Sequence, residues 1–198
     1  MTTTVEKIKI LRGETGLAII DCKKALENAG GDLDKALTVL RAKSLEMAEK
    51  KLDKETGEGL IGSYVHTNGK IGVLVEVTCE TDFVARTDDF KELVKNLTLQ
   101  ITASSPTWVS KDDVPEDVIE EHRKIIAESD EIKAKPEQVQ ERIVTGKMDL
   151  FFRKNVLLEQ SYVKDDSKTV SEYIKEKIAK LGENIKVIRF VRFEFNKG

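Results

Sequence analysis

Two β-rich runs on either side of an Asn68-Gly69 dipeptide constrain the fold more than any other feature of this sequence. An Asn-Gly pair between such runs is the strongest short-range pattern for a β-hairpin. A two-residue turn at this pair places Tyr64 opposite Val73. Because side chains alternate along a strand, one face of the second strand then carries Ile71, Val73, Val75, Val77 and Cys79. The sequence therefore predicts an antiparallel hairpin with that face toward the core.

The first 42 residues follow a helical period instead. Asp32 is a suitable N-cap, and the four apolar residues after it repeat at i, i+3, i+4 and i+7: Leu33, Ala36, Leu37 and Leu40. Two shorter helices are predicted before Gly30-Gly31. We expect a three-helix module over residues 1–42, and its small core is typical of a docking unit. The charged residues 43–57 predict a helical linker.

The helical period returns after the hairpin, over residues 88–100, and helices are predicted to begin at Pro115 and Pro136. An amphipathic helix over residues 169–182 precedes a final strand, IKVIRFVRFEF. Strands joined tightly and then separated by a long helical segment favour the α+β class. We therefore expect residues 58–198 to form one α+β core with an antiparallel sheet of about three strands.

Composition narrows the classes of protein to which the chain can belong. The 198 residues carry a formal net charge of −3, which argues against nucleic-acid binding through bulk electrostatics. No apolar run approaches the length of a membrane span. Cys22 and Cys79 lie far apart, without a C-x-x-C motif, and this favours a reducing compartment. We expect a cytoplasmic protein, or the mature form of an organellar one.

The sequence offers little for catalysis. Cys79 and His66 are the best pair for a nucleophile and its base, but Cys79 has the core parity of its strand, where a thiol is a small apolar group. The two histidines and two cysteines show no zinc spacing. The GEGLIG stretch lacks the Lys-Ser/Thr of a phosphate loop. We therefore predict no metal site, no cofactor and no enzymatic activity.

Phe83, in the stretch CETDFVART, lies between the hairpin and the helix that follows. It could be a core residue at the start of that helix, with Asp82 as the N-cap. It could equally be an exposed aromatic side chain at a loop tip that fills a partner's pocket. Periodicity alone leaves both alternatives open.

The chain resembles the elongation factor Ts family, whose members are guanine-nucleotide exchange factors of elongation factor Tu, a translational GTPase. The resemblance covers nearly the whole length and depends most on DCKKAL together with TDFVAR. It implies that the N-terminal helices are similar to ubiquitin-associated (UBA) domains. It also implies that Thr81, Asp82, Phe83 and Val84 push into elongation factor Tu near its Mg²⁺ ion and so promote GDP release. Cys22, Lys23 and Lys24 would supply a second contact.

Two other function classes remain as alternatives. In the first, the chain is a non-enzymatic adaptor whose N-terminal helices bind a ubiquitin-like or helical partner. The weaker second alternative is a cysteine enzyme.

The chain resembles the short form of the family, with one core unit, and this implies a homodimer that forms a two-plus-two complex with elongation factor Tu. The last strand supports self-association, since it carries apolar residues on both faces: Phe190, Val191, Phe193 and Phe195. A monomer is the alternative, if helices between Pro115 and Leu158 cover the sheet.

Overall fold

The computed structural model describes residues 3–196 and begins with three helices, as expected. These are α1 (Thr4–Thr15), α2 (Ile19–Asn28) and α3 (Leu33–Glu49). The Asp32 side chain accepts hydrogen bonds from the backbone N–H groups of Asp34 and Lys35, which confirms it as the N-cap of α3. Helix α3 continues past residue 42, through the first half of the predicted linker.

The sheet has three antiparallel strands in the order β1-β2-β5: β1 (Glu58–Val65), β2 (Ile71–Cys79) and β5 (Ile185–Glu194). Tyr64 lies opposite Val73, so the predicted register is confirmed. The predicted two-residue turn is wrong. The Gly69 N–H donates to the His66 carbonyl, and Gly69 has a left-handed φ of 67°, so Thr67 and Asn68 occupy the centre of the turn. The α+β class is confirmed.

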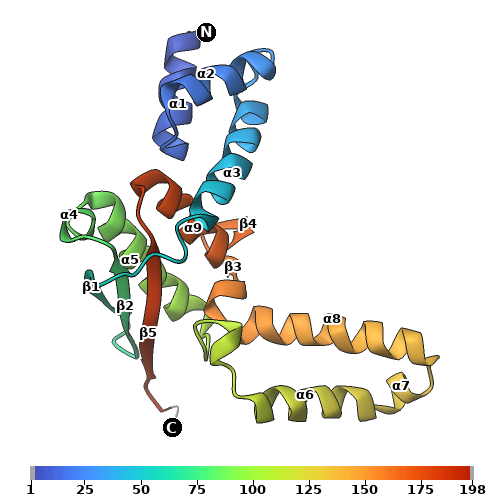
Figure 1. The fold of residues 1–198 in the computed structure, drawn as a ribbon. Coiled ribbons are helices and arrows are strands. Elements are labelled where there is room, and N and C mark those ends of the chain that lie inside the picture. Colours follow the sequence, from blue (N-terminus) through green and yellow to red (C-terminus); the bar gives the residue numbers. More distant parts are fainter. Residues whose placement is uncertain (1–2, 197–198) are drawn as a thin grey trace.

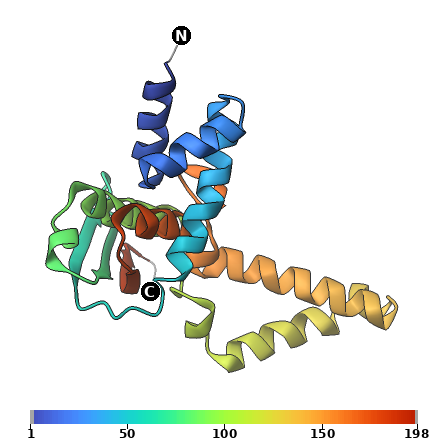
Figure 2. The same cartoon turned by 45° about the horizontal axis from the view of Figure 1, so that its top comes forward.

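One face of the sheet is covered by helices. Helix α5 (Asp88–Ser104) packs against β1 and β2, and α9 (Val170–Leu181) lies between α5 and α3 (Figures 1 and 2). The buried side of β2 is the predicted one, since Val73, Val75, Val77 and Cys79 are all inside. They pack in one cluster with Phe90, Leu93, Leu97 and Ile101 of α5. The short helix α4 (Asp82–Ala85) joins β2 to α5.

The segment from residue 111 to 155 projects away from the sheet as a helical hairpin (Figures 1 and 2). A 3₁₀ turn, Lys111–Asp113, leads into α6 (Glu116–Glu128), α7 (Asp130–Lys133) and α8 (Glu137–Asn155). Pro115 and Pro136 are the N-cap residues of α6 and α8. The hairpin has its own cluster of buried residues, Ile126, Ile132 and Met148. The alternative in which these helices cover the sheet is therefore wrong.

The chain returns from the hairpin through a 3₁₀ turn (Leu157–Glu159) and two short strands, β3 (Ser161–Tyr162) and β4 (Asp165–Thr169). These strands pair with each other and were not expected from the sequence.

The outer face of the sheet is apolar and exposed. Side chains that alternate with the buried set point to this face, and the pairing of Leu74 with Val191 and of Gly72 with Phe193 places both partners there. The large exposed apolar side chains on this face are Ile61, Val65, Leu74, Val191 and Phe193. Ile61 is 70% exposed and Phe193 67%. The last strand thus has apolar residues on both faces, as expected, because Val187 and Phe190 pack against the core.

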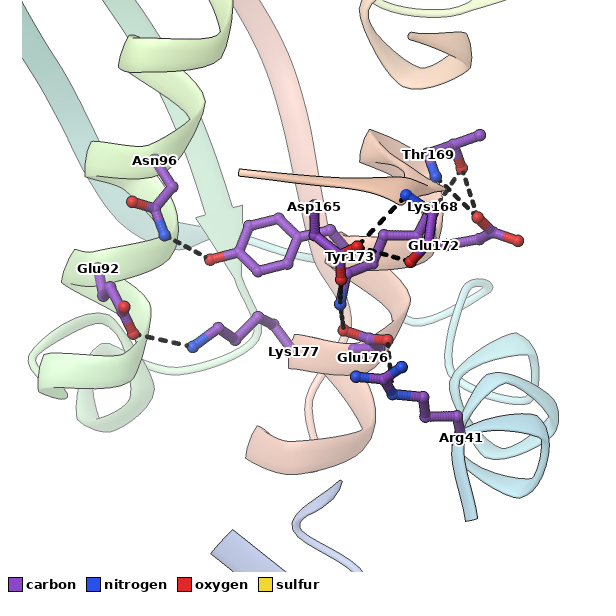
Figure 3. A network of polar contacts seen from close by, with 11 residues as sticks. Arg41, Glu92, Asn96, Asp165, Lys168, Thr169, Glu172, Tyr173, Glu176 and Lys177 are labelled. Carbon is purple, nitrogen blue, oxygen red and sulfur yellow. Dashed lines mark hydrogen bonds and ion pairs between the residues drawn. The ribbon is translucent and has the colours of Figure 1, made fainter. Parts of the chain in front are cut away.

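Polar contacts fix α9 between two other helices (Figure 3). Toward α3, the Glu176 carboxylate lies 3.8 Å from the Arg41 guanidinium. Toward α5, the Asn96 amide donates to the Tyr173 hydroxyl at 2.8 Å, and Lys177 pairs with Glu92 at 3.1 Å. Helix α9 therefore connects the N-terminal helices to the core.

Candidate functional site

The TDFV segment forms a single helical turn at the surface. Thr81 is its N-cap, and its hydroxyl accepts from the Val84 N–H at 3.4 Å. Asp82 lies in the first turn and pairs with Arg86 at 2.7 Å. A negative charge at that position is favourable because the N-terminus of a helix carries a partial positive charge.

Phe83 is 79% exposed. Successive side chains of a helix point about 100° apart, so the packing of the next two residues against the core turns Phe83 outward. Ala85 is buried, and Val84 packs against the main core. The alternative in which Phe83 fills the core behind an Asp82 cap is therefore wrong. A large ring held outward on a packed turn is an arrangement suited to insertion into a partner's pocket.

The second predicted surface begins in α2. Cys22 is fully buried, and its Sγ lies 3.8 Å from the Leu17 carbonyl oxygen. Burial raises the pKa of this thiol. Cys22 therefore belongs to the buried cluster of the N-terminal helices and is not exposed on their surface. Lys23 and Lys24 are exposed, and Lys23 lies 3.7 Å from Glu27.

Sequence reasoning missed two exposed residues beside these lysines. Ile19 and Ile20 begin α2 and are both exposed, although isoleucine is usually buried. The buried apolar stripe of this helix consists of Cys22, Ala25 and Leu26. The two isoleucines lie outside that stripe. Their place within one helical turn of Lys23 was the sequence signal that could have assigned them to the same exposed surface.

The candidate catalytic pair does not assemble. His66 lies beside the turn end of the hairpin, where its Nδ1 is 3.2 Å from the Tyr64 hydroxyl. Cys79 lies at the other end of β2, opposite Glu58. Burial, aided by the charge of Glu183, raises the pKa of Cys79 to about 11, so the thiol is protonated at neutral pH.

Among the residues whose side chains the structure describes, no three His, Cys, Asp or Glu side chains are grouped so that they could hold a metal ion. None of the helices within residues 3–196 is long and apolar enough to cross a membrane.

The family of the chain follows from its relatives. A family model described as elongation factor TS matches residues 23–197. An elongation factor Ts from Coprothermobacter proteolyticus is 54% identical, over 98% of this chain and 98% of its own length. Those from Thermosipho melanesiensis and Thermotoga petrophila are 53% and 52% identical, over 94% and 100% of this chain and 95% and 98% of their own lengths. The chain belongs to the elongation factor Ts family.

Elongation factor Ts proteins are translation elongation factors, which places this chain in protein synthesis. The family match includes the exposed turn at residues 81–84 and begins at Lys23, directly after the buried Cys22. Each of the three relatives named above is matched over nearly its whole length.

Proposed function

We propose that this protein binds the GDP form of elongation factor Tu and promotes GDP release by dislocating the GTPase's Mg²⁺ ion. No covalent bond is made or broken, so the protein is an exchange factor without enzymatic chemistry of its own. The observation that carries this proposal is the exposed Phe83 ring on a turn packed against the core, in a chain of the elongation factor Ts family. The protein would act in the cytoplasm, or in the matrix or stroma of an organelle.

The mechanism is steric and electrostatic. A GTPase neutralises the phosphates of its nucleotide with Mg²⁺, which is held by few protein ligands and several waters. Phe83 inserts between packed elements of the partner and shifts those ligands, while Thr81, Asp82 and Val84 fix the turn that carries it. Loss of the ion leaves the phosphates without their counter-charge, and GDP leaves. Because coupling is reciprocal, rebinding of nucleotide expels the exchange factor.

The N-terminal module supplies a second contact in this proposal. We assign that contact to Lys23 and Lys24, together with Ile19 and Ile20, because these four side chains form one exposed group at the start of α2. The likeness of the three helices to UBA domains is part of the same proposal, and so is the division of the chain at residues 42 and 57.

The proposal includes a homodimer and a two-plus-two complex with elongation factor Tu. The outer face of the sheet supports it, since exposed apolar side chains from all three strands lie there together. An apolar face of this kind is a common mark of a protein interface. No contact with nucleic acid or membrane is part of the proposal.

A GDP-release assay tests the function. Phe83→Ala should slow the release of labelled GDP from elongation factor Tu by roughly a hundredfold, which corresponds to about 2.7 kcal/mol of lost coupling. Its melting temperature should stay close to that of the unchanged protein, because Phe83 is 79% exposed. Ile125→Ala is the matched control, an exposed apolar side chain on α6.

Two results would contradict the proposal. One is GDP release that the unchanged protein does not accelerate, which would favour the adaptor alternative. The other is full activity of Phe83→Ala.

A further inference from the structure

The helical turn that carries Phe83 is too short to be stable without contacts to the rest of the protein. Helix α4 has four residues, with backbone hydrogen bonds from Ala85 N–H to Thr81 and from Arg86 N–H to Asp82, both of 3.2 Å. A single helical turn is unstable in water because fixing its backbone costs more than these bonds return. Other parts of the chain must therefore hold Thr81, where the turn begins.

The Glu183 carboxylate provides that hold from 102 residues away in the sequence. One oxygen accepts from the Thr81 N–H at 3.0 Å, and the other accepts from the Thr81 hydroxyl at 2.6 Å. Donation to Glu183 orients the hydroxyl so that its lone pairs face the Val84 N–H, which it caps. Hydrogen bonds to an ionised carboxylate are about twice as strong as neutral ones.

The segment that carries Glu183 is itself fixed. Gly182 ends α9 with a left-handed φ of 76°, and β5 begins at Ile185, so Glu183 lies between two regular elements. The backbone N–H of Asn184 donates to the Glu80 carboxylate at 2.7 Å. Residues 80 and 81 are thus bound side by side to residues 183 and 184.

The segment of residues 183–184 also binds residues 52–54, which lie before β1. The buried Asn184 side chain donates to the carbonyl oxygens of Leu52, at 3.0 Å, and Lys54, at 2.7 Å. Three stretches of the chain meet here, and Glu183 is the member that reaches the cap of α4.

We propose that Glu183 is a positioning residue for nucleotide exchange, because its carboxylate fixes Thr81 and so orients the Phe83 ring before the partner is met. This inference rests on the proposed function. Glu183 acts through Thr81 and need not touch the GTPase. Preorganisation lowers the cost of reaching the productive arrangement, so its loss affects the step in which the ring enters the partner more than the first encounter.

The test is a concentration series of GDP release with Glu183→Gln. Glutamine has the same shape but one acceptor oxygen, which can accept from the Thr81 N–H. The Thr81 hydroxyl then faces an NH2 group to which it cannot donate, so it loses its hydrogen bond to an ionised carboxylate and the orientation that turns a lone pair toward the Val84 N–H. The maximal release rate should fall by roughly tenfold, while the factor concentration for half-maximal rate changes by less than about twofold. A general loss of folded protein would lower the active concentration and would not produce this split.

The control is Glu49→Gln, which removes an exposed carboxylate that pairs with Lys175 at 3.2 Å. It should leave both kinetic parameters unchanged. Thr81→Val removes the same hydroxyl contact from the other side and serves if Glu183→Gln does not fold. The double variant Thr81→Val/Glu183→Gln should be no slower than Thr81→Val alone, because the two residues act as one unit.

The outcomes separate this inference from the proposed function. If Phe83→Ala slows release and Glu183→Gln behaves like Glu49→Gln, the positioning role is overturned and the proposed function stands. Additive losses in the double variant also overturn it, since Glu183 would then act elsewhere. If Phe83→Ala has no effect, the proposed function fails, and the positioning role fails with it.

Discussion

Cys79 ends β2 directly before the turn that carries Phe83, and its thiol donates to the Thr81 carbonyl at 3.2 Å. Such donation requires the protonated thiol. Burial and the nearby charge of Glu183 raise the pKa of Cys79 to about 11, so the thiol keeps its proton across the neutral range. Cys79 is therefore part of the support of the turn.

We predict that both thiols of the folded protein react slowly with iodoacetamide near pH 8, by roughly tenfold or more relative to the unfolded chain. The reason is that Cys22 and Cys79 are fully buried and have raised pKa values. Mass spectrometry of alkylated protein, with and without denaturant, measures this. One fast-reacting thiol in the folded protein would contradict it.

The raised pKa of Cys79 also gives a pH dependence of stability. An unfolded cysteine ionises near pH 8.5. The folded thiol keeps its proton up to about pH 11. The free energy of unfolding should therefore be unaffected by this group below about pH 8.5 and should fall as the pH rises from there toward 11. Cys79→Ala should lose this part of the decline in urea-unfolding curves. An equal decline in both proteins would show that other groups cause it.

The outward direction of Phe83 could not be predicted from the sequence. Four helical residues give no usable period, and both Asp82 and Thr81 are good N-cap types. The direction is set by Ala85, which is buried, and by Val84, which is partly buried against the core. The partner of Thr81 was equally hidden, because nothing in the local sequence relates it to Glu183.

At the scale of elements, the strands were easier to predict than the helical hairpin. The register of β1 and β2 follows from side-chain alternation, since a slip by one residue would turn Val73, Val75 and Val77 away from the core. The helices α6 and α8 were also expected from Pro115 and Pro136. An amphipathic pattern shows that a helix has an apolar face, however, but not which part of the protein covers that face. These two helices cover each other and leave the outer face of the sheet uncovered.

The buried residues of the N-terminal helices and those of the main core form two separate clusters. The N-terminal cluster ends with Leu40, and Ala48 belongs to the main core. The N-terminal helices contact α9 at two places. Arg41 pairs with Glu176, and the backbone at Gly16 lies so close to the backbone of Lys180 that any side chain at position 16 would clash with it. The N-terminal module thus packs on α9 without sharing its buried cluster.

We predict that deletion of residues 1–42 leaves a folded core with a cooperative melting transition, because the main cluster loses none of its buried members. The factor concentration for half-maximal GDP release should rise, since the contact at Lys23 and Lys24 is gone. Circular dichroism and the release assay measure the two effects. An unfolded remainder would show that the module and the core form one unit.

At the scale of the whole molecule, the exposed turn and the N-terminal helices are held in place relative to each other. Helix α9 joins them: it is fixed to α3 through Arg41–Glu176 and to α5 through Lys177–Glu92 (Figure 3). The helical hairpin projects away from both surfaces (Figures 1 and 2). This leaves the outer face of the sheet uncovered within the described part of a single chain.

We predict that the protein is a homodimer through this outer face. Leu74 lies on the central strand, 45% exposed, opposite Val191. Leu74→Lys places a charge in the middle of the proposed contact, where burying it without a partner would cost several kcal/mol. The variant should sediment as a monomer near 22.3 kDa, while the unchanged protein sediments at about twice that mass. Its fold should persist because the side chain points away from the core.

Ile125→Lys is the control for that experiment, since Ile125 is similarly apolar and exposed but lies on α6. It should remain a dimer, and sedimentation equilibrium over a range of concentrations measures all three proteins. If the unchanged protein stays at the monomer mass at tens of micromolar, the homodimer is wrong. If Leu74→Lys remains a dimer as stable as the control, the chains associate through another surface, and the exposed edges of β1 and β5 are the next candidates.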